Sequence, residues 1–200
     1  MKSLYFSQGE HYLSIDDFKK IEEKLKQFPL EEVTVGDAGE PNKCLVGRLV
    51  EDKPGTKPKL LNSNLSKDIL SIIFSEKAKD FIRKEIKDFS SAQNLFVRRA
   101  QFNLLSKGSF VGQHLDIDSN PNYRIAVVFQ LGSFFEGGEF DVYKFMGDSE
   151  PFQSIKPEFG SICISDSRVP HAVARVKEGT RKSLVMFVSD QNEENPRELI

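Results

Sequence analysis

Residues 95–131 read LFVRRAQFNLLSKGSFVGQHLDIDSNPNYRIAVVFQL, and this stretch decides the fold of the chain. Two segments within it, 95–105 and 123–131, are rich in Val, Ile, Leu and Phe, and Gly, Asn and Pro occur between them. Such segments are typical of β-strands, because β-branched and aromatic side chains fit a pleated, partly buried surface. The stretch therefore predicts two strands separated by a region that carries the triplet His114-Leu115-Asp116.

Short segments of the same kind recur further along the chain. They cover residues 139–145, 161–165, 171–176 and 183–189, and Gly, Pro, Asn and Asp separate them. Many short strands at regular spacing indicate a sandwich or a jelly roll. We therefore expect a mainly β chain with flanking helices (α+β). Its core would be a double-stranded β-helix (jelly roll, cupin-like) that spans 94–190.

The residues before this core predict helices that pack on its outside. Ser14 and Asp17 resemble a helix capping box. A second helical region is expected from Ser66 to about residue 86. In the first region, apolar residues recur every three or four positions, as on one face of a helix; they are Ile15, Phe18, Ile21, Leu25 and Phe28.

The segment 32–65, between these two regions, is interrupted repeatedly by Gly and Pro. Long punctuated loops often cover binding sites. We expect this segment to form a lid, with a short strand near 44–50. Residues 1–93 would then be a helical N-terminal part, and 1–200 a single domain.

The composition sets limits on the class of protein. Apolar residues make up 38% of the chain, charged residues 29%, and the net charge is −2. This charge gives no reason to expect nucleic acid or an anionic membrane as partner. The polar N-terminus and the lack of a long apolar run lead us to expect a soluble, cytoplasmic protein. Cys44 and Cys163 are too far apart to suggest a structural zinc site or a disulfide framework.

Candidate metal ligands come from a small set, because the chain has only three histidines, His11, His114 and His171. Residues two apart on an extended segment share a face, so His114 and Asp116 can both reach one ion. His171 is the best candidate for a third ligand. Two imidazoles and one carboxylate leave open positions on the metal, as in non-haem iron(II) oxygenases. Asp118 is an alternative carboxylate, but the His-x-Asp spacing favours Asp116.

Arg181 stands ten residues after His171. Its guanidinium is permanently charged and its planar fork matches a carboxylate. Taken singly, the His-x-Asp triplet, His171 and Arg181 would each be read as ordinary surface polar residues. Their order and spacing together carry the argument.

That order resembles the Fe(II)/2-oxoglutarate-dependent dioxygenase superfamily, and within it the prolyl-4-hydroxylase-like branch. The match consists of His-x-Asp, a distal His, an Arg ten residues later and a hydroxyl at Ser183. Three stretches agree with the family's strands and turns: 102–108, 123–140 with its Gly-Gly-Glu turn, and 159–164. The resemblance covers roughly residues 95–190 and leaves out the first 90.

The resemblance implies a role for each of these residues. His114, Asp116 and His171 would bind the iron and form the catalytic set. Arg181 would pair with the distal carboxylate of 2-oxoglutarate. Many relatives carry a tyrosine where this chain has Leu105, so other side chains would replace the phenol contact. Further contacts are expected from Ser183, Asn103 and Gln101 to the co-substrate, and from Arg124 and Asp118 to the substrate.

The implied reaction uses Fe(II), 2-oxoglutarate and O2, with ascorbate as an accessory reductant. An unactivated C–H bond would be hydroxylated while 2-oxoglutarate is converted to succinate and CO2. Asp116 favours hydroxylation over halogenation, because the carboxylate occupies the position that a halide would need. The expected substrate is proline-like, either a peptidyl proline or a free amino acid or small metabolite. A substrate carboxylate has four candidate partners: Arg99, Arg124, Arg168 and Arg175.

Two other classes of function stay open. One is a non-catalytic, cupin-like protein that binds or senses a metal or 2-oxoglutarate. The other is a zinc hydrolase with the same three ligands. The sequence does not indicate the oligomeric state.

Overall fold

The structure is a computed structural model that describes residues 4–6, 12–34, 43–85 and 94–197. Its helices are α1 (Ile15–Leu25), α2 (Ser63–Ile73) and α3 (Glu76–Glu85), with a short 3-10 helix, η2 (Asp116–Asp118). Its strands are β1 (Leu4–Phe6), β2 (Glu31–Thr34), β3 (Lys43–Glu51), β4 (Lys59–Leu60), β5 (Phe96–Ser106), β6 (Val111–His114), β7 (Ile125–Leu131), β8 (Phe135–Gly137), β9 (Phe140–Val142), β10 (Gln153–Ile155), β11 (Ile162–Asp166), β12 (His171–Val173) and β13 (Val176–Ser189).

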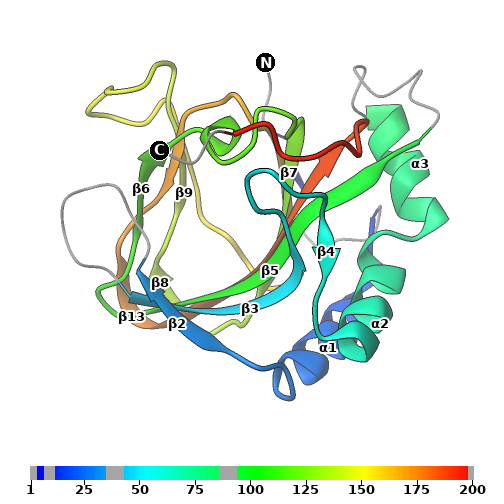
Figure 1. Ribbon diagram of the computed structural model, residues 1–200. Coiled ribbons are helices and arrows are strands. Elements are labelled where there is room, and N and C mark those ends of the chain that lie inside the picture. The colour runs from blue at the N-terminus through cyan, green and yellow to red at the C-terminus, as the bar shows by residue number, and fades with distance from the viewer. Residues whose placement is uncertain (1–3, 7–11, 35–42, 86–93, 198–200) are drawn as a thin grey trace.

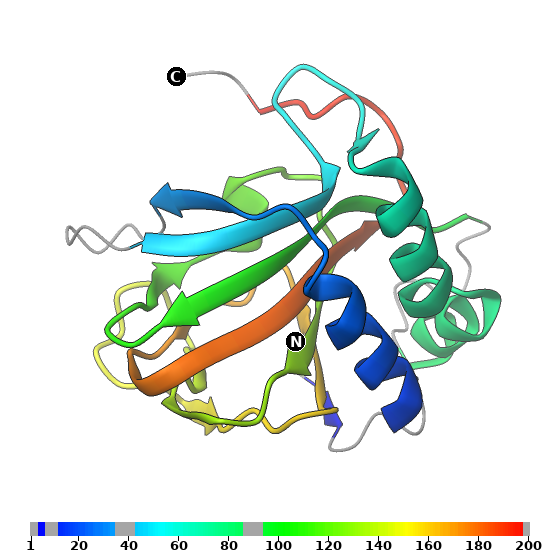
Figure 2. The ribbon, with the colours of Figure 1, turned by 90° about the horizontal axis from the view of Figure 1, so that it is seen from below.

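The strands form two antiparallel sheets. The larger sheet has the order β1-β11-β7-β13-β5-β3-β2, with β4 beside β3 and β8 beside β13, and the smaller has the order β10-β9-β12-β6. The helices lie together on one side of the molecule, away from the strands of the smaller sheet (Figures 1 and 2). This arrangement confirms the predicted double-stranded β-helix with helices packed outside.

The two faces of the larger sheet have different roles. Successive side chains of a strand point to opposite faces. On β5, β7 and β13, one set packs against the helices in the main apolar core; it contains Ala100, Phe102, Val127, Phe129, Leu184 and Met186. The alternate set faces the smaller sheet and lines a cavity; it contains Gln101, Asn103, Val128, Arg181, Ser183 and Val185. A register slip of one residue would exchange the two sets, so the register is strongly specified.

Helix α1 packs on the main apolar core. Ser14 caps the helix and forms the predicted capping box with Asp17. Phe18 is fully buried, and its ring centroid lies 6.4 Å from that of Phe129 on β7. The hydroxyl of Tyr12, just before the helix, donates to the carbonyl of Ile73 at 2.8 Å and so joins the start of α1 to the end of α2.

The described part of segment 32–65 is mostly sheet, which differs from the expected lid. The expected strand near 44–50 is present as β3, and it pairs with β5 from Leu45 to Val50. Cys44 and Val46 are buried on one face of β3 and Leu49 on the other. This two-sided burial explains why a segment rich in Gly and Pro becomes part of the sheet. Residues 35–42 lie outside the described residues.

Strand β13 is longer than the expected strand 183–189. It begins at Val176, and Arg181 and Lys182 pair with β5. Glu178 to Lys182 read as a turn because they are polar. They form strand because β8 and β5 offer them partners. No helix in the described ranges is long and apolar enough to cross a membrane.

We expect Phe18→Ala to lower the free energy of unfolding by about 3–5 kcal/mol, because it leaves a cavity between α1 and the sheet. Urea denaturation would measure the change. Phe134→Ala is the matched control, because this side chain is 91% exposed and its loss should change stability by no more than about 0.5 kcal/mol. Equal effects of the two substitutions would contradict the packing described here.

Candidate active site

His114, Asp116 and His171 come together between the two sheets. His114 ends β6, and His171, its cross-strand partner, begins β12. The Nε2 atoms of His114 and His171 lie 3.5 and 3.6 Å from Oδ1 of Asp116. Nitrogen and oxygen ligands bind a divalent transition metal at about 2.0–2.2 Å, so neighbouring ligand atoms around an ion lie roughly 3 Å apart. The three side chains therefore need only a small contraction to hold one ion.

Backbone carbonyls orient both imidazoles. Nδ1 of His114 lies 2.8 Å from the Gly112 carbonyl oxygen, and Nδ1 of His171 lies 2.8 Å from that of Val169. A carbonyl can only accept, so each Nδ1 carries a proton, and each Nε2 is the nitrogen left to bind a cation on the side of Asp116. Burial lowers the pKa of His171 below its usual value, although Asp116 opposes this shift. The neutral ring is the form that binds a metal.

Asp116 provides the observation that a cation fits here. The residue is 5% exposed, and its buried Oδ2 has no hydrogen-bond partner among the described residues. An ionised carboxylate oxygen is costly to bury unless a cation or donors compensate it. A metal ion between Asp116 and the two Nε2 atoms would supply that compensation.

Arg181 lies in the same cavity, which has a volume of about 100 Å³. The residue is 3% exposed, and its Nη1 donates to Oγ of Ser183 at 3.4 Å. Its Nε is buried without a partner, and none of the carboxylates in the described ranges lies within ion-pair distance of it. Burial lowers the pKa of Arg181 to about 10, which still leaves it charged at neutral pH. The cavity therefore holds a buried cation to which the described residues supply no anion.

The Gly-Gly turn explains how Arg181 is held. Gly138 has a φ of +66°, and a Cβ at this position would lie 2.7 Å from Cδ of Arg181. Both the backbone conformation and the close contact require glycine. The turn thus packs directly on the aliphatic part of the arginine.

Other predicted co-substrate residues also face the interior. Asn103, Leu105 and Ser183 line the cavity of the triad, and Gln101 lines an adjoining chamber. Gln101 donates through Nε2 to Oδ1 of Asn103 at 2.7 Å. Leu105 is the strand partner of Arg181, so an apolar side chain stands where the resemblance expected a phenol.

The structure does not bring Asp118 and Arg124, the two expected substrate residues, to the cavity wall. Asp118 is exposed on η2. Arg124 lies 3.6 Å from Asp190, from its Nε to the carboxylate. Both residues follow Asp116 closely in the sequence. The 3-10 turn, however, directs the chain out of the site.

The cysteines were not expected in the site. Cys44 lines the adjoining chamber, and Cys163 lies beside Arg181 in a small cavity behind it. Burial raises the pKa of Cys44 to about 11 and that of Cys163 to about 12, so both thiols are neutral. Side chains alternate between the two faces of a strand, so the expected strand at 44–50 could have placed Cys44 on the same face as Val46.

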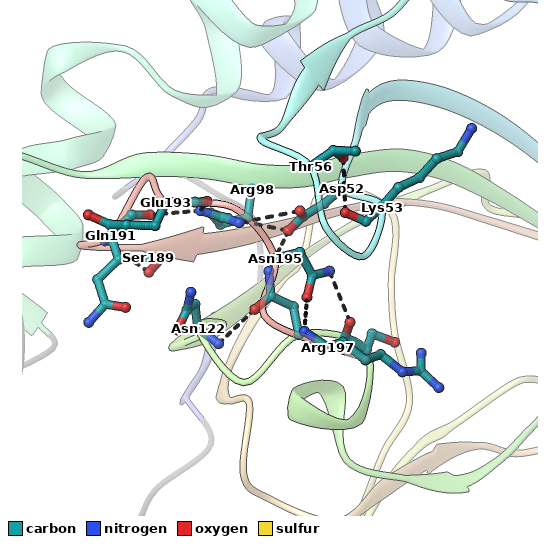
Figure 3. A network of polar contacts seen from close by, with 12 residues as sticks. Asp52, Lys53, Thr56, Arg98, Asn122, Ser189, Gln191, Glu193, Asn195 and Arg197 are labelled. Carbon is teal, nitrogen blue, oxygen red and sulfur yellow. Dashed lines mark hydrogen bonds and ion pairs between the residues drawn. The ribbon is translucent and has the colours of Figure 1, made fainter. Parts of the chain in front are cut away.

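A buried ion pair anchors the loop that follows Asp116. Arg98 donates through Nε and Nη2 to the Asp52 carboxylate at 3.3 Å, and both side chains are fully buried (Figure 3). Arg98 also donates to the carbonyl oxygens of Gln191 and Glu193. Asn120, two residues after η2, donates to Asp52 at 2.7 Å. The loop beyond the metal ligand is thereby joined to β5 and to the segment after β13.

Asn195 extends this network on the other side. Its backbone pairs with Gly55 and Thr56 of the β3–β4 loop, and its side-chain nitrogen donates to the carbonyl of Ser119 at 3.3 Å. The β3–β4 loop, the loop after η2 and the segment after β13 thus hold one another beside the site.

Comparison with known proteins identifies the family. Residues 100–189 match the family model described as the 2OG-Fe(II) oxygenase superfamily. The solved structure of an oxidoreductase of the 2OG-Fe(II) oxygenase family from Burkholderia pseudomallei is 32% identical, with a TM-score of 0.88. The match covers 98% of this chain and 89% of that one. The chain belongs to the 2OG-Fe(II) oxygenase superfamily. A search of curated proteins found no match for this oxygenase.

More distant structures share the fold of this oxygenase. A prolyl-4-hydroxylase from Pseudomonas putida is 17% identical with a TM-score of 0.63, and the match covers 94% of this chain and 92% of that one. A prolyl hydroxylase from Trichoplax adhaerens, solved with a hypoxia-inducible-factor peptide fragment, is 11% identical with a TM-score of 0.58. That match covers 94% of this chain and 83% of the other.

Membership of the superfamily brings its cofactors, Fe(II), 2-oxoglutarate and O2. The triad of His114, Asp116 and His171 fits iron binding, because it offers two imidazole nitrogens and a carboxylate with an unpartnered oxygen to one point. The accessory role expected for ascorbate stays a prediction.

We expect Asp52→Asn to lower the free energy of unfolding by about 3–5 kcal/mol, because it leaves the Arg98 charge buried and uncompensated. Chemical denaturation of both proteins would measure the change. Asp16→Asn is the matched control, because the Asp16 side chain is 79% exposed beside Lys19 and such pairs contribute at most about 1 kcal/mol. A loss no larger than that of the control would show that Asp52 does not anchor the loop.

Proposed function

We propose that this oxygenase hydroxylates an unactivated C–H bond and converts 2-oxoglutarate to succinate and CO2 in the same cycle. The observation that carries the proposal is the buried Arg181, without a carboxylate partner in the described ranges, in the cavity that also contains the triad. When bound, iron(II) supplies the activation of O2 that couples the decarboxylation to oxidation of the substrate. The steps below concern what the side chains of this chain do.

In this proposal, His114, Asp116 and His171 hold the iron on one side and leave its other positions for 2-oxoglutarate and O2. The carbonyls of Gly112 and Val169 keep both imidazoles in the tautomer that presents Nε2. Because Asp116 fills the third position, no place is left for a halide ligand. This favours hydroxylation over halogenation.

Arg181 would bind the distal carboxylate of 2-oxoglutarate. A guanidinium fork forms two parallel charge-assisted bonds to a carboxylate, and these are strong away from water. Oγ of Ser183 already lies within reach of the guanidinium and would add a contact. Phe140, Val128 and Val173 line the cavity and would keep water from the reacting groups.

Two alternatives are less well supported. A zinc hydrolase with the same triad has no use for a buried arginine in the cavity. A non-catalytic binding protein would use both the triad and Arg181, so only turnover separates it from the proposal. The substrate would be an amino acid, a small metabolite or a prolyl residue. The prolyl hydroxylases that share the fold are too distant to choose among these.

The proposal is tested by mixing the protein with Fe(II) and 2-oxoglutarate without O2. Chelation of the iron by the 2-oxo acid should give a weak visible charge-transfer band, and admission of O2 should then yield succinate. A band without succinate under any substrate would favour the non-catalytic alternative. Activity that requires neither O2 nor 2-oxoglutarate would favour the hydrolase.

We expect His171→Ala and Asp116→Ala to abolish both iron retention and succinate formation, because each removes one of three ligands. Iron content after gel filtration measures retention. Asp118→Ala is the matched control for iron content, because Asp118 is the alternative carboxylate two residues away and is exposed. Loss of iron in the Asp118 variant, with retention in the Asp116 variant, would move the carboxylate ligand to Asp118.

We expect Arg181→Met to raise the KM for 2-oxoglutarate roughly 10- to 100-fold or more, because it removes two charge-assisted bonds. Iron retention should be unchanged. Stability should be equal or greater, since a buried charge without an anionic partner is replaced by an apolar chain. An unchanged requirement for 2-oxoglutarate in a well-folded variant would show that another cation binds the co-substrate.

A further inference from the structure

A second chamber adjoins the cavity of the triad. It has a volume of about 210 Å³, twice that of the first. The two share walls, because His114, Asp116 and Asn103 line both. Arg99 and Gln101 line the chamber but not the cavity of the triad. A molecule in this chamber would therefore extend from Arg99 to the metal site.

Arg99 is held in a defined position. It is the strand partner of Phe187, whose ring stacks on that of Tyr123 at 4.7 Å. Its Nε donates to Oε1 of Gln101 at 2.9 Å, which directs the guanidinium along the inner face of β5. Burial raises the pKa of Tyr123, and the nearby positive charge of Arg99 opposes this shift. The arginine is thus packed into the chamber wall.

No carboxylate in the described part of the chain forms an ion pair with Arg99. The neighbouring acid, Asp52, is occupied, because it accepts two bonds from Arg98 (Figure 3) and one from Asn120. Among the described residues, the carboxylate on the chamber wall is that of Asp116, which belongs to the triad. The chamber therefore has a positive end that the described residues leave without a counter-charge.

The other arginines that the sequence offered for a substrate carboxylate are used elsewhere. Arg124 pairs with Asp190 and Arg168 with Asp166. Arg175 stacks over the ring of Phe110 and donates to the carbonyl of Gly108. None of the three lines the chamber or the cavity.

We propose that Arg99 binds a free carboxylate of the substrate, and that the substrate is a short peptide or an N-acyl amino acid. This rests on the proposed function. Alternate residues along a strand are about 6.6–6.8 Å apart, so Arg99 and Asn103 are separated by roughly 13 Å of backbone. Because the side chain of Gln101 lies between those of Arg99 and Asn103, the carboxylate and the oxidised carbon would lie several bonds apart. Gln101, between them, presents an amide that suits a peptide or acyl group of the substrate.

The test uses pairs of compounds that differ only in this charge. N-acetyl amino acids and dipeptides, each as the free acid and as the C-terminal amide, are added to the iron-loaded protein with 2-oxoglutarate and O2. Succinate is measured. The free acids should stimulate its formation, and amidation should raise the KM roughly 10- to 100-fold, since a charge-assisted bond is lost.

Arg99→Gln should abolish this preference, so that acid and amide have similar KM values. Arg99→Lys should retain part of it, because the charge remains without the planar fork. Arg83→Gln is the matched control: Arg83 lies on α3, outside the barrel, and pairs with Asp80. It should preserve the full preference. A circular dichroism melt verifies that each variant is folded.

Three results would overturn the inference while leaving the proposed function intact. One is equal stimulation by acids and amides, and another is a preference that persists in Arg99→Gln. The third is stimulation only by longer, C-terminally amidated peptides with internal Asp or Glu. In that case the carboxylate that Arg99 binds would belong to a side chain of a polypeptide. If no acid stimulates turnover or alters the anaerobic charge-transfer band, the inference also fails. If that band and succinate are both absent, the proposed function itself fails.

Discussion

The alternation of side chains along β5, β7 and β13 is the constraint on which the rest of the structure depends. Outward residues build the core beneath the helices, and inward residues build the site. The helices therefore support the chemistry without touching it: they hold the sheet in one register. That register sets Arg181 opposite Leu105 and Ser183 opposite Asn103. The inner face can be polar because a cavity, and not a second apolar layer, separates it from the smaller sheet.

Much of this could be predicted from local patterns. The strands around 95–105 and 123–131, the capping box at Ser14 and the shared face of His114 and Asp116 all follow from short-range spacing. His171 joined them because the chain has only three histidines. The helix-facing position of Phe102 and Phe129 was harder to predict, because apolar rings suit either a core or a cavity wall. Only the register assigns them to the core, while Phe140 and Phe187 line the interior.

What the sequence could not indicate depends on contacts between distant residues. Asp52 and Arg98 are far apart in the chain, so nothing in either neighbourhood reveals a buried pair. Arg99 stands next to Arg98 and looks equivalent to it. Strand geometry sends the two side chains to opposite faces, one into a structural network and the other into a chamber. The strand near 44–50 was expected, but its place between β2 and β5 was not, because β5 is distant in the chain.

The central position of β13 has a consequence for biosynthesis. This strand lies between β5 and β7 and pairs with both, yet it follows them in the chain. While the ribosome is still making residues 176–189, β5 and β7 each have an open edge, and unpaired strand edges promote aggregation. The strand that closes this gap also carries Arg181. A nascent chain thus acquires its complete sheet and the buried arginine of its cavity in the same late event.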